Sequence, residues 1–237
     1  MMVTNLRPRS DQIEELTRDV ELPLSPLRKV HLEIIAEMLE QAWRDLKSTQ
    51  GSTLSTGSET EVTSLMEIRI NKLLDDSALW ASLVQGTARG GESLNYDGTK
   101  LEKRPDLSLQ LTDRSRNFPL KVECKLIDSS SGKSVRLYCK EGLLRFVQGE
   151  YAWATQEAFM LAYVRDGSST TSVLTPHLKT KRTTKENPYH SDVPEQSNIH
   201  GSLDLSRSRH GRPFTYIGNV ANDDPGSIEL WHLWVST

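Results

Sequence analysis

Hydrophobic and polar residues alternate along two neighbouring segments in the middle of the chain. In residues 106–112 every second position is a leucine, and the positions between the leucines are polar. Residues 118–127 repeat this pattern, with Val122, Cys124 and Leu126 on one side. Alternation with a period of two is typical of a strand with one buried face. Because the polar residues 113–117 read as a turn, the two segments are predicted to form a β-hairpin.

The other face of this hairpin carries three charged residues. Asp106 opens the first segment, and Glu123 and Lys125 lie on the polar side of the second. Residues two apart in a strand point in the same direction, so Glu123 and Lys125 are expected side by side. We expect these side chains to meet Asp106 on an exposed polar face.

Helical patterns precede the hairpin. Residues 1–24 are polar and are expected to form an arm, with a short helix at 10–19. Ser25-Pro26 resembles a helix start, and apolar residues keep helical spacing from there to about Lys47. The Ser/Thr/Gly-rich residues 48–58 predict a loop. A second amphipathic helix is predicted from about Glu59 to Asp76.

The remaining elements are shorter. We expect a turn or weak strand at 86–100, a third strand at 135–139, a helix at 140–150 and a buried strand at 158–164, followed by an irregular segment at 165–200 and strands at 214–217 and 228–235. This order predicts an α/β fold with a mixed central sheet and an additional N-terminal helix packed outside it. The expected organisation is an N-terminal arm and helix (1–58) and one compact domain with a C-terminal extension (59–237).

Composition narrows the class of protein. The 237 residues are 36% hydrophobic and 26% charged, which is typical of a globular chain. The net charge of −3 gives no overall basic field, so any nucleic-acid contact has to be local. The two cysteines lack metal-ligand spacing and are expected to be buried free thiols. With no apolar segment of membrane length and no leader-like N-terminus, we expect a cytoplasmic protein without a membrane partner.

The hairpin residues suit phosphodiester chemistry. Mg²⁺ prefers oxygen ligands and is usually held by one or two carboxylates together with substrate phosphate. Asp106 and Glu123 supply such carboxylates, and the peptide carbonyl of Cys124 is a further candidate ligand. The Lys125 ammonium would orient or deprotonate an attacking water, or offset charge that builds on the phosphate.

This arrangement resembles the PD-(D/E)XK nuclease superfamily, the fold of many restriction enzymes. The matching residues are Pro105-Asp106, then sixteen residues, then Glu123-Cys124-Lys125. The resemblance implies a restriction-endonuclease-like core of helix, three strands, helix and strand, from about 59 to 164, and a Mg²⁺ or Mn²⁺ cofactor. It also implies a further acid on the first core helix. Glu61 is our choice for catalysis and metal binding, and Glu59 and Glu67 compete with it.

A second, more general resemblance covers residues 138–167, together with the segments SRHGR and IELWHLW. These are similar to bacterial restriction-like nucleases, some of them associated with phage defence. The resemblance implies that Arg145, Gln148 and Tyr151 line the second core helix near the site.

Two further groups of residues are open to more than one interpretation. The basic residues of 177–190 would contact a nucleic-acid backbone or simply be solvated; they are Lys179, Lys181, Arg182 and Lys185. Ser208, His210 and Arg212 would assist catalysis, hold a phosphate or be inert. Trp231 and Trp234 are expected in the core or at an interface rather than stacked on bases.

Two classes of function follow from the sequence. The first is a metal-dependent nuclease acting on DNA, an effector of restriction or phage defence, with RNA as a near alternative substrate. The second is a non-catalytic binding or assembly module with a nuclease-like fold. Because no recognition domain is visible, the nuclease interpretation also predicts a homodimer or a partner protein that recruits or activates the chain.

Overall fold

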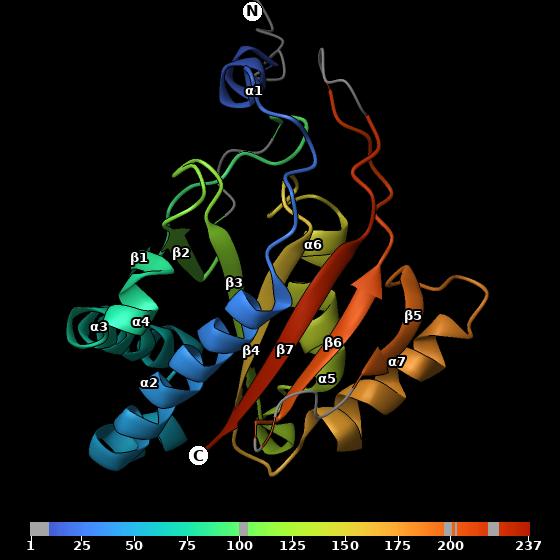
Figure 1. Cartoon of the computed structure of the whole chain (residues 1–237). Coiled ribbons are helices and arrows are strands. Elements are labelled where there is room, and N and C mark those ends of the chain that lie inside the picture. Colours follow the sequence, from blue (N-terminus) through green and yellow to red (C-terminus); the bar gives the residue numbers. More distant parts are fainter. Residues whose placement is uncertain (1–9, 100–103, 197–200, 202, 218–222) are drawn as a thin grey trace, which may run out of the picture.

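The computed structural model describes residues 10–99, 104–196, 201, 203–217 and 223–237. The chain forms a mixed α/β fold in which helices cover both faces of one mixed sheet (Figure 1). Residues 1–9 of the expected N-terminal arm lie outside the described residues.

The sheet has seven strands in the order β1-β2-β3-β4-β7-β6-β5. Strands β3, β4 and β7 run parallel to one another in the centre, and the other neighbours are antiparallel. The strand bounds are β1 Val84–Ala88, β2 Leu107–Leu111, β3 Leu120–Ile127, β4 Glu157–Val164, β5 Ser191–Gln196, β6 Leu205–His210 and β7 Ile228–Ser236. The predicted hairpin is therefore confirmed as β2 and β3, and the predicted buried strand as β4.

Along the chain, the helices precede the strands or connect them. Their bounds are α1 Ser10–Thr17, α2 Lys29–Thr56, α3 Glu59–Asp76, α4 Ala78–Ala81, α5 Val135–Tyr138, α6 Leu144–Val147 and α7 Thr175–Arg182. Short irregular helical turns occupy Ser129–Ser131, Cys139–Leu143 and Thr170–Leu174. The predicted helices at 10–19 and 59–76 are confirmed as α1 and α3.

The loop predicted at 48–58 is wrong, because α2 continues to Thr56 with a kink at Gln50. Leu54 is buried and anchors this last stretch to the core. The hydroxyl groups of Ser55 and Thr56 donate back to the carbonyls of Gly51 and Ser52, so polar composition is compatible with helix here. The helix also begins at Lys29 rather than at Ser25-Pro26.

The sequence pattern predicted that the N-terminal helix packs outside the fold. Helix α2 is instead part of the main core. Trp43 of α2 stacks on Tyr163 of β4, with 5.3 Å between the ring centroids. Its indole Nε1 donates to the carbonyl of Ser236 in β7 at 2.9 Å. The buried residues of α2 and α3 form one hydrophobic cluster with one face of the sheet.

The opposite face is covered by residues 135–147 and by α7. The third strand predicted at 135–139 is wrong: these residues begin an irregular helix from α5 through a π-helical turn to α6. Gly142 lies in that turn, where a Cβ would come within 2.6 Å of the Met160 methyl carbon and 3.5 Å of Glu123 Cγ. Its lack of a side chain lets the helix approach β3 and β4 closely.

The segment predicted as irregular at 165–200 contains helical residues 170–182 and strand β5. The strand predicted at 214–217 is wrong, since these residues have no regular structure. Phe214 and Tyr216 are instead buried beside Trp153 in a small separate cluster. Both cysteines are buried and free, as predicted. Within the described part of the chain, no helix is long and apolar enough to cross a membrane.

Candidate active site

The candidate site lies where β2 and β3 separate. The two strands pair between Leu107–Leu109 and residues 120–122, after which β3 continues beside β4 alone. This leaves backbone N–H groups of β3 without a strand partner, and an unpaired buried N–H is costly. Asp106 Oδ2 accepts from the N–H of Cys124 at 2.8 Å, and Glu59 Oε2 accepts from the N–H of Leu126 at 2.9 Å. The free strand edge therefore positions two carboxylates from different elements.

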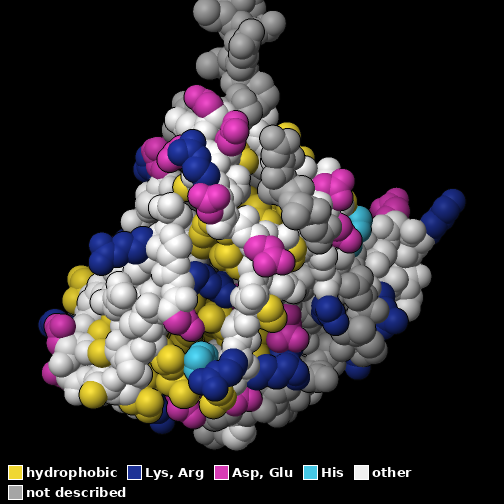
Figure 2. Space-filling view, turned by 45° about the horizontal axis from the view of Figure 1, so that its top comes forward, with side chains coloured by type: hydrophobic (Ala, Val, Ile, Leu, Met, Phe, Trp, Pro, Cys, Tyr) yellow, Lys and Arg dark blue, Asp and Glu magenta, His cyan; other side chains and the backbone are white. Residues whose placement is uncertain are grey.

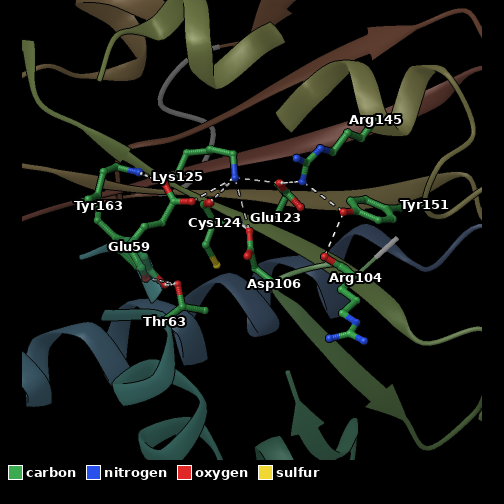
Figure 3. A network of polar contacts seen from close by, with 11 residues as sticks. Glu59, Thr63, Arg104, Asp106, Glu123, Cys124, Lys125, Arg145, Tyr151 and Tyr163 are labelled. Atoms are coloured by element: carbon green, nitrogen blue, oxygen red, sulfur yellow. Dashed lines mark hydrogen bonds and ion pairs between the residues drawn. The ribbon is translucent and has the colours of Figure 1, made fainter. Parts of the chain in front are cut away.

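The ammonium group of Lys125 lies among oxygen atoms at this edge (Figure 3). Its Nζ is 2.8 Å from Glu123 Oε1 and 2.9 Å from the carbonyl oxygen of Cys124. Glu59 Oε1 and Asp106 Oδ2 lie further away, at 3.3 and 3.6 Å. The structure thus brings together the residues of the sequence motif. Although burial opposes the charge, the surrounding carboxylates raise the pKa of Lys125 above its ordinary value.

Glu123 is fully buried, which corrects the expectation of an exposed polar face. The irregular helix at 135–147 covers this face of β3, and Arg145 Nη1 donates to Glu123 Oε1 at 2.6 Å. Burial raises the pKa of Glu123 to about 7, and the negative charge of Asp106 contributes to this rise. The positive charges of Lys125 and Arg145 act in the opposite direction and lower it. The second carboxylate oxygen of Glu123, Oε2, is buried and has no hydrogen-bond partner among the described residues.

Asp106 stands in a similar environment. Burial raises the pKa of its carboxyl group, while the charge of Lys125 and the Cys124 N–H act in the opposite direction. Two neighbouring carboxylates, both with raised pKa values and both next to a lysine, are typical of functional clusters.

Arg145 extends the cluster towards Tyr151. Arg145 Nη1 also lies 3.1 Å from the Tyr151 hydroxyl, which donates to the carbonyl of Arg104 at 3.0 Å. Arg145 and Tyr151 are therefore placed near the site, as the second resemblance implies. Gln148 is exposed at the end of the helix.

The acid that reaches the cluster from helix α3 is Glu59, and this corrects the choice of Glu61. Glu61 is exposed, and its Oε2 accepts from the backbone N–H and the hydroxyl of Ser58, both at 2.7 Å. These contacts form a capping box at the start of α3 and lower the pKa of Glu61. Glu67 Oε1 accepts from the backbone N–H of Arg89 and is also occupied elsewhere.

The donor set fits a Mg²⁺ or Mn²⁺ ion. Asp106, Glu123 and the Cys124 carbonyl give hard oxygen ligands, and the partnerless Glu123 Oε2 is a buried acceptor that a cation would satisfy. Across the described residues, no three His, Cys, Asp or Glu side chains form a metal site by themselves. In the structure, the positive charge between the Asp106 and Glu123 carboxylates is the Lys125 ammonium group.

The basic residues at 179–185 lie away from this cluster. Lys179, Lys181 and Arg182 are on helix α7 rather than in the expected loop, and Lys185 follows that helix. Helix α7 packs beside β5, at the opposite edge of the sheet from β1 (Figure 1). Three strands, β4, β7 and β6, lie between β5 and β3 in the sheet. On the face drawn in Figure 2, basic and acidic side chains are interspersed.

His210 and Ser208 belong to a buried hydrogen-bond chain. His210 Nδ1 faces the carbonyl of Tyr189 at 2.7 Å and must carry a proton there, so its Nε2 accepts from Ser208 at 2.6 Å. Ser208 then accepts from Nε2 of His232 at 2.6 Å, and the Tyr138 hydroxyl donates to His232 Nδ1 at 2.9 Å. Burial lowers the pKa of His210 to about 4 and of His232 to about 3. Both imidazoles are neutral near pH 7 and are suited to structural support.

Arg212 and the two tryptophans are also structural. The Arg212 guanidinium donates to the carbonyls of Trp153, Thr155 and Gly226 at 2.9–3.0 Å, and also to that of Pro225. Trp231 and Trp234 are buried, which confirms their expected place in the core.

Sequence reasoning missed two features of the site. The Arg145–Glu123 contact depends on a helix that the pattern placed five residues too late. Glu59 accepts a hydrogen bond from the Leu126 N–H only because β2 stops pairing with β3 before that residue. The end of strand pairing cannot be predicted from the local sequence pattern. In comparisons with known proteins, no family model, curated protein or solved structure matches the chain.

Proposed function

We propose that the chain is a metal-dependent endonuclease of the PD-(D/E)XK type that hydrolyses phosphodiester bonds in DNA. One observation carries this proposal: Asp106, Glu123, the Cys124 carbonyl and Lys125 converge where β2 and β3 separate. A chance set of surface charges would not be expected to share one buried strand edge.

The order of elements supports a restriction-endonuclease-like core. Helix α3 is followed by strands β1, β2 and β3, the irregular helix from α5 to α6, and strand β4. This is helix, three strands, helix and strand, as the resemblance implies. The three strands are β1 at Val84–Ala88 together with β2 and β3, and the third strand expected after the hairpin at 135–139 is helical instead.

The residues divide the work as follows. Asp106, Glu123 and the Cys124 carbonyl would hold Mg²⁺ or Mn²⁺, with Glu59 as the acid from the first core helix. When bound, the metal activates water and polarises the phosphate. Lys125, held protonated by its acidic neighbours, acts as a hydrogen-bond donor that offsets charge on the phosphate oxygens. This favours the charge-offsetting role of Lys125 over that of a general base.

The choice of DNA and of a defence role comes from the resemblance to restriction-like nucleases. A role as effector of restriction or phage defence predicts that expression of the chain in a bacterial host lowers phage plaque counts. Expression of a Glu123→Gln variant is the matched control, and equal plaque counts for both would argue against that role.

Purified protein incubated with supercoiled plasmid and Mg²⁺ tests the activity itself. We expect nicked or linear DNA with Mg²⁺ or Mn²⁺, and intact plasmid with EDTA or with Ca²⁺ alone, because Ca²⁺ takes looser and longer coordination. A parallel incubation with single-stranded and duplex RNA distinguishes the alternative substrate. Intact plasmid and intact RNA under all metal conditions would contradict the nuclease proposal.

A second candidate is a non-catalytic binding or assembly module. The observation that favours it is the internal charge balance of the site, where Lys125 and Arg145 already pair with Glu123. In that case the cluster would serve only to hold α3, β3 and α6 together. Mg²⁺ would then change neither nucleic-acid cleavage nor the thermal stability of the protein.

A further inference from the structure

A cavity of about 410 Å³ lies next to the candidate active site. Lys121 and Ser108 belong to its lining, together with Arg116, Leu94, Trp153 and Ala154. Its size falls within the usual range for small-molecule sites, roughly 300–1,000 Å³. None of the residues assigned to metal binding lines it.

Among the described residues, the buried cation in the cavity has no acidic partner. Lys121 is only 8% exposed, and its Nζ donates to the hydroxyl of Ser108 at 3.1 Å. In the part of the chain that the structure describes, no carboxylate forms an ion pair with Lys121. Burying an unpaired ammonium is costly, so a lysine in this setting calls for an anion from outside the chain.

The cavity and the candidate site occupy neighbouring positions on the same two strands. Ser108 of β2 is the cross-strand partner of Lys121 of β3. Glu123 is two residues further along β3 than Lys121 and so lies on the same side of that strand. Asp106 lies just before β2, two residues before Ser108. The Cα atoms of Lys121 and Glu123 are therefore about 7 Å apart.

The walls of the cavity suit the organic part of such a ligand. Trp153 Nε1 donates to the carbonyl of Leu94 at 2.8 Å, and the ring of Phe118 packs edge-on against Trp153. These contacts fix an apolar wall before any ligand arrives. Arg116 and Glu92 are exposed lining residues of opposite charge, and Glu92 already pairs with Arg104 at 2.8 Å.

We propose that this cavity binds one nucleotide of the substrate strand, next to the bond that is cut. Its phosphate contacts Lys121, and its sugar and base lie against the apolar wall. This inference rests on the proposed nuclease function. It adds a subsite that would give the enzyme a grip on a single strand beside the cleavage point, despite the net negative charge of the chain.

The test compares wild-type protein with Lys121→Met and with Lys72→Met, a matched loss of one exposed lysine on α3. Thymidine monophosphate binding is measured by calorimetry, and DNA cleavage is measured as separate KM and kcat values. We expect Lys121→Met to weaken mononucleotide binding and to raise KM by about tenfold or more, with kcat little changed. Lys72→Met should match wild type in both assays. Thermal melting checks folding, and Lys121→Met should melt no lower than wild type, because it removes a buried unpaired charge.

The outcomes distinguish a phosphate of the substrate strand from the phosphate of a free nucleotide as the anion that Lys121 binds. If KM is higher in Lys121→Met and unchanged in Lys72→Met, the strand subsite is supported, with or without measurable mononucleotide binding. Lys121-dependent mononucleotide binding with unchanged KM would show a site for a free nucleotide and overturn the strand subsite. Unchanged KM without mononucleotide binding overturns both. If wild-type protein cuts no nucleic acid, the nuclease proposal and the strand subsite fail together, and the titration alone decides whether the cavity binds a nucleotide.

Discussion

The carboxylate of Glu59 accepts a hydrogen bond from the backbone N–H of Leu126 at 2.9 Å, across 67 residues of sequence. Its other oxygen lies 3.3 Å from Lys125 Nζ. The first residue of helix α3 is therefore attached both to the free edge of β3 and to the charged cluster. The cluster and the core helix are held together by one side chain.

Glu59→Gln should accordingly lower DNA cleavage by about tenfold or more, because it removes a carboxylate next to Lys125 while an amide oxygen can still accept from Leu126. Glu61→Gln is the matched control on the same helix turn. It should keep wild-type cleavage and lower the unfolding free energy only slightly, because the capping box becomes weaker. Cleavage rates and urea unfolding curves of both variants check this, and greater loss of cleavage in Glu61→Gln would contradict the assignment.

Lys125→Met should remove cleavage, by about 100-fold or more, and still leave the oxygen ligands in place. Since the ammonium now neutralises those oxygens, its loss should increase the rise in melting temperature that Mg²⁺ produces. Thermal melting with and without Mg²⁺, together with a plasmid assay, measures both effects. Wild-type cleavage by this variant would refute the role given to Lys125.

Replacing the four cations at and after α7 with alanine tests the predicted nucleic-acid contact away from the site; they are Lys179, Lys181, Arg182 and Lys185. Each lost phosphate contact should reduce the slope of log affinity against log salt by about 0.9 for duplex DNA. Because α7 packs beside β5 and supplies none of the proposed metal ligands, the cleavage rate of bound DNA should not change. Binding measured at several salt concentrations gives the slope, and an unchanged slope would show that these residues are only solvated.

The buried imidazole of His232 predicts a pH dependence of stability. Its pKa is about 3 in the folded protein and about 6.5 in an unfolded chain, so between these values only the unfolded chain binds the proton. The unfolding free energy should therefore fall as pH drops below about 6.5, by up to about 1.4 kcal/mol per pH unit from this residue.

His232→Gln should flatten that fall, and urea unfolding at about pH 5 and about pH 7 measures the difference. Tyr138→Phe is the control, since it removes the hydroxyl that donates to His232 and keeps the imidazole. It should lower stability at both pH values and retain the dependence. If wild type and His232→Gln lose the same unfolding free energy between these two pH values, burial of His232 does not cause the pH dependence.

The sequence predicted much of this fold where local pattern decides structure. The alternation around Leu109 and Val122 identified the hairpin, and helical spacing identified α3 with the bounds that the structure has. It failed at Ser/Thr-rich residues 48–56, where burial of Leu54 outweighs a composition typical of loops. It failed again at 135–139, where β-branched and aromatic residues pack as a helix over the sheet.

The candidate site was predictable in its motif residues and not in its surroundings. Asp106, Glu123 and Lys125 follow from alternation along two paired strands. The burial of Glu123 follows from the close approach of the helix at Gly142, which is a tertiary contact. Glu59 was preferable to Glu61 only once Ser58 was seen to use Glu61 for its cap.

The nuclease activity itself is measured as DNA cleavage by wild type and by Glu123→Gln, in Mg²⁺ and in EDTA. The glutamine keeps the size of the buried side chain, so loss of activity cannot be ascribed to a cavity as it could with alanine. Circular dichroism and thermal melting confirm that the variant is folded. We predict that wild type cuts only with Mg²⁺ and that the folded variant is slower by about 100-fold or more. Equal cleavage by the two proteins, or no cleavage by wild type with Mg²⁺, would show that this site is not a metal-dependent nuclease centre.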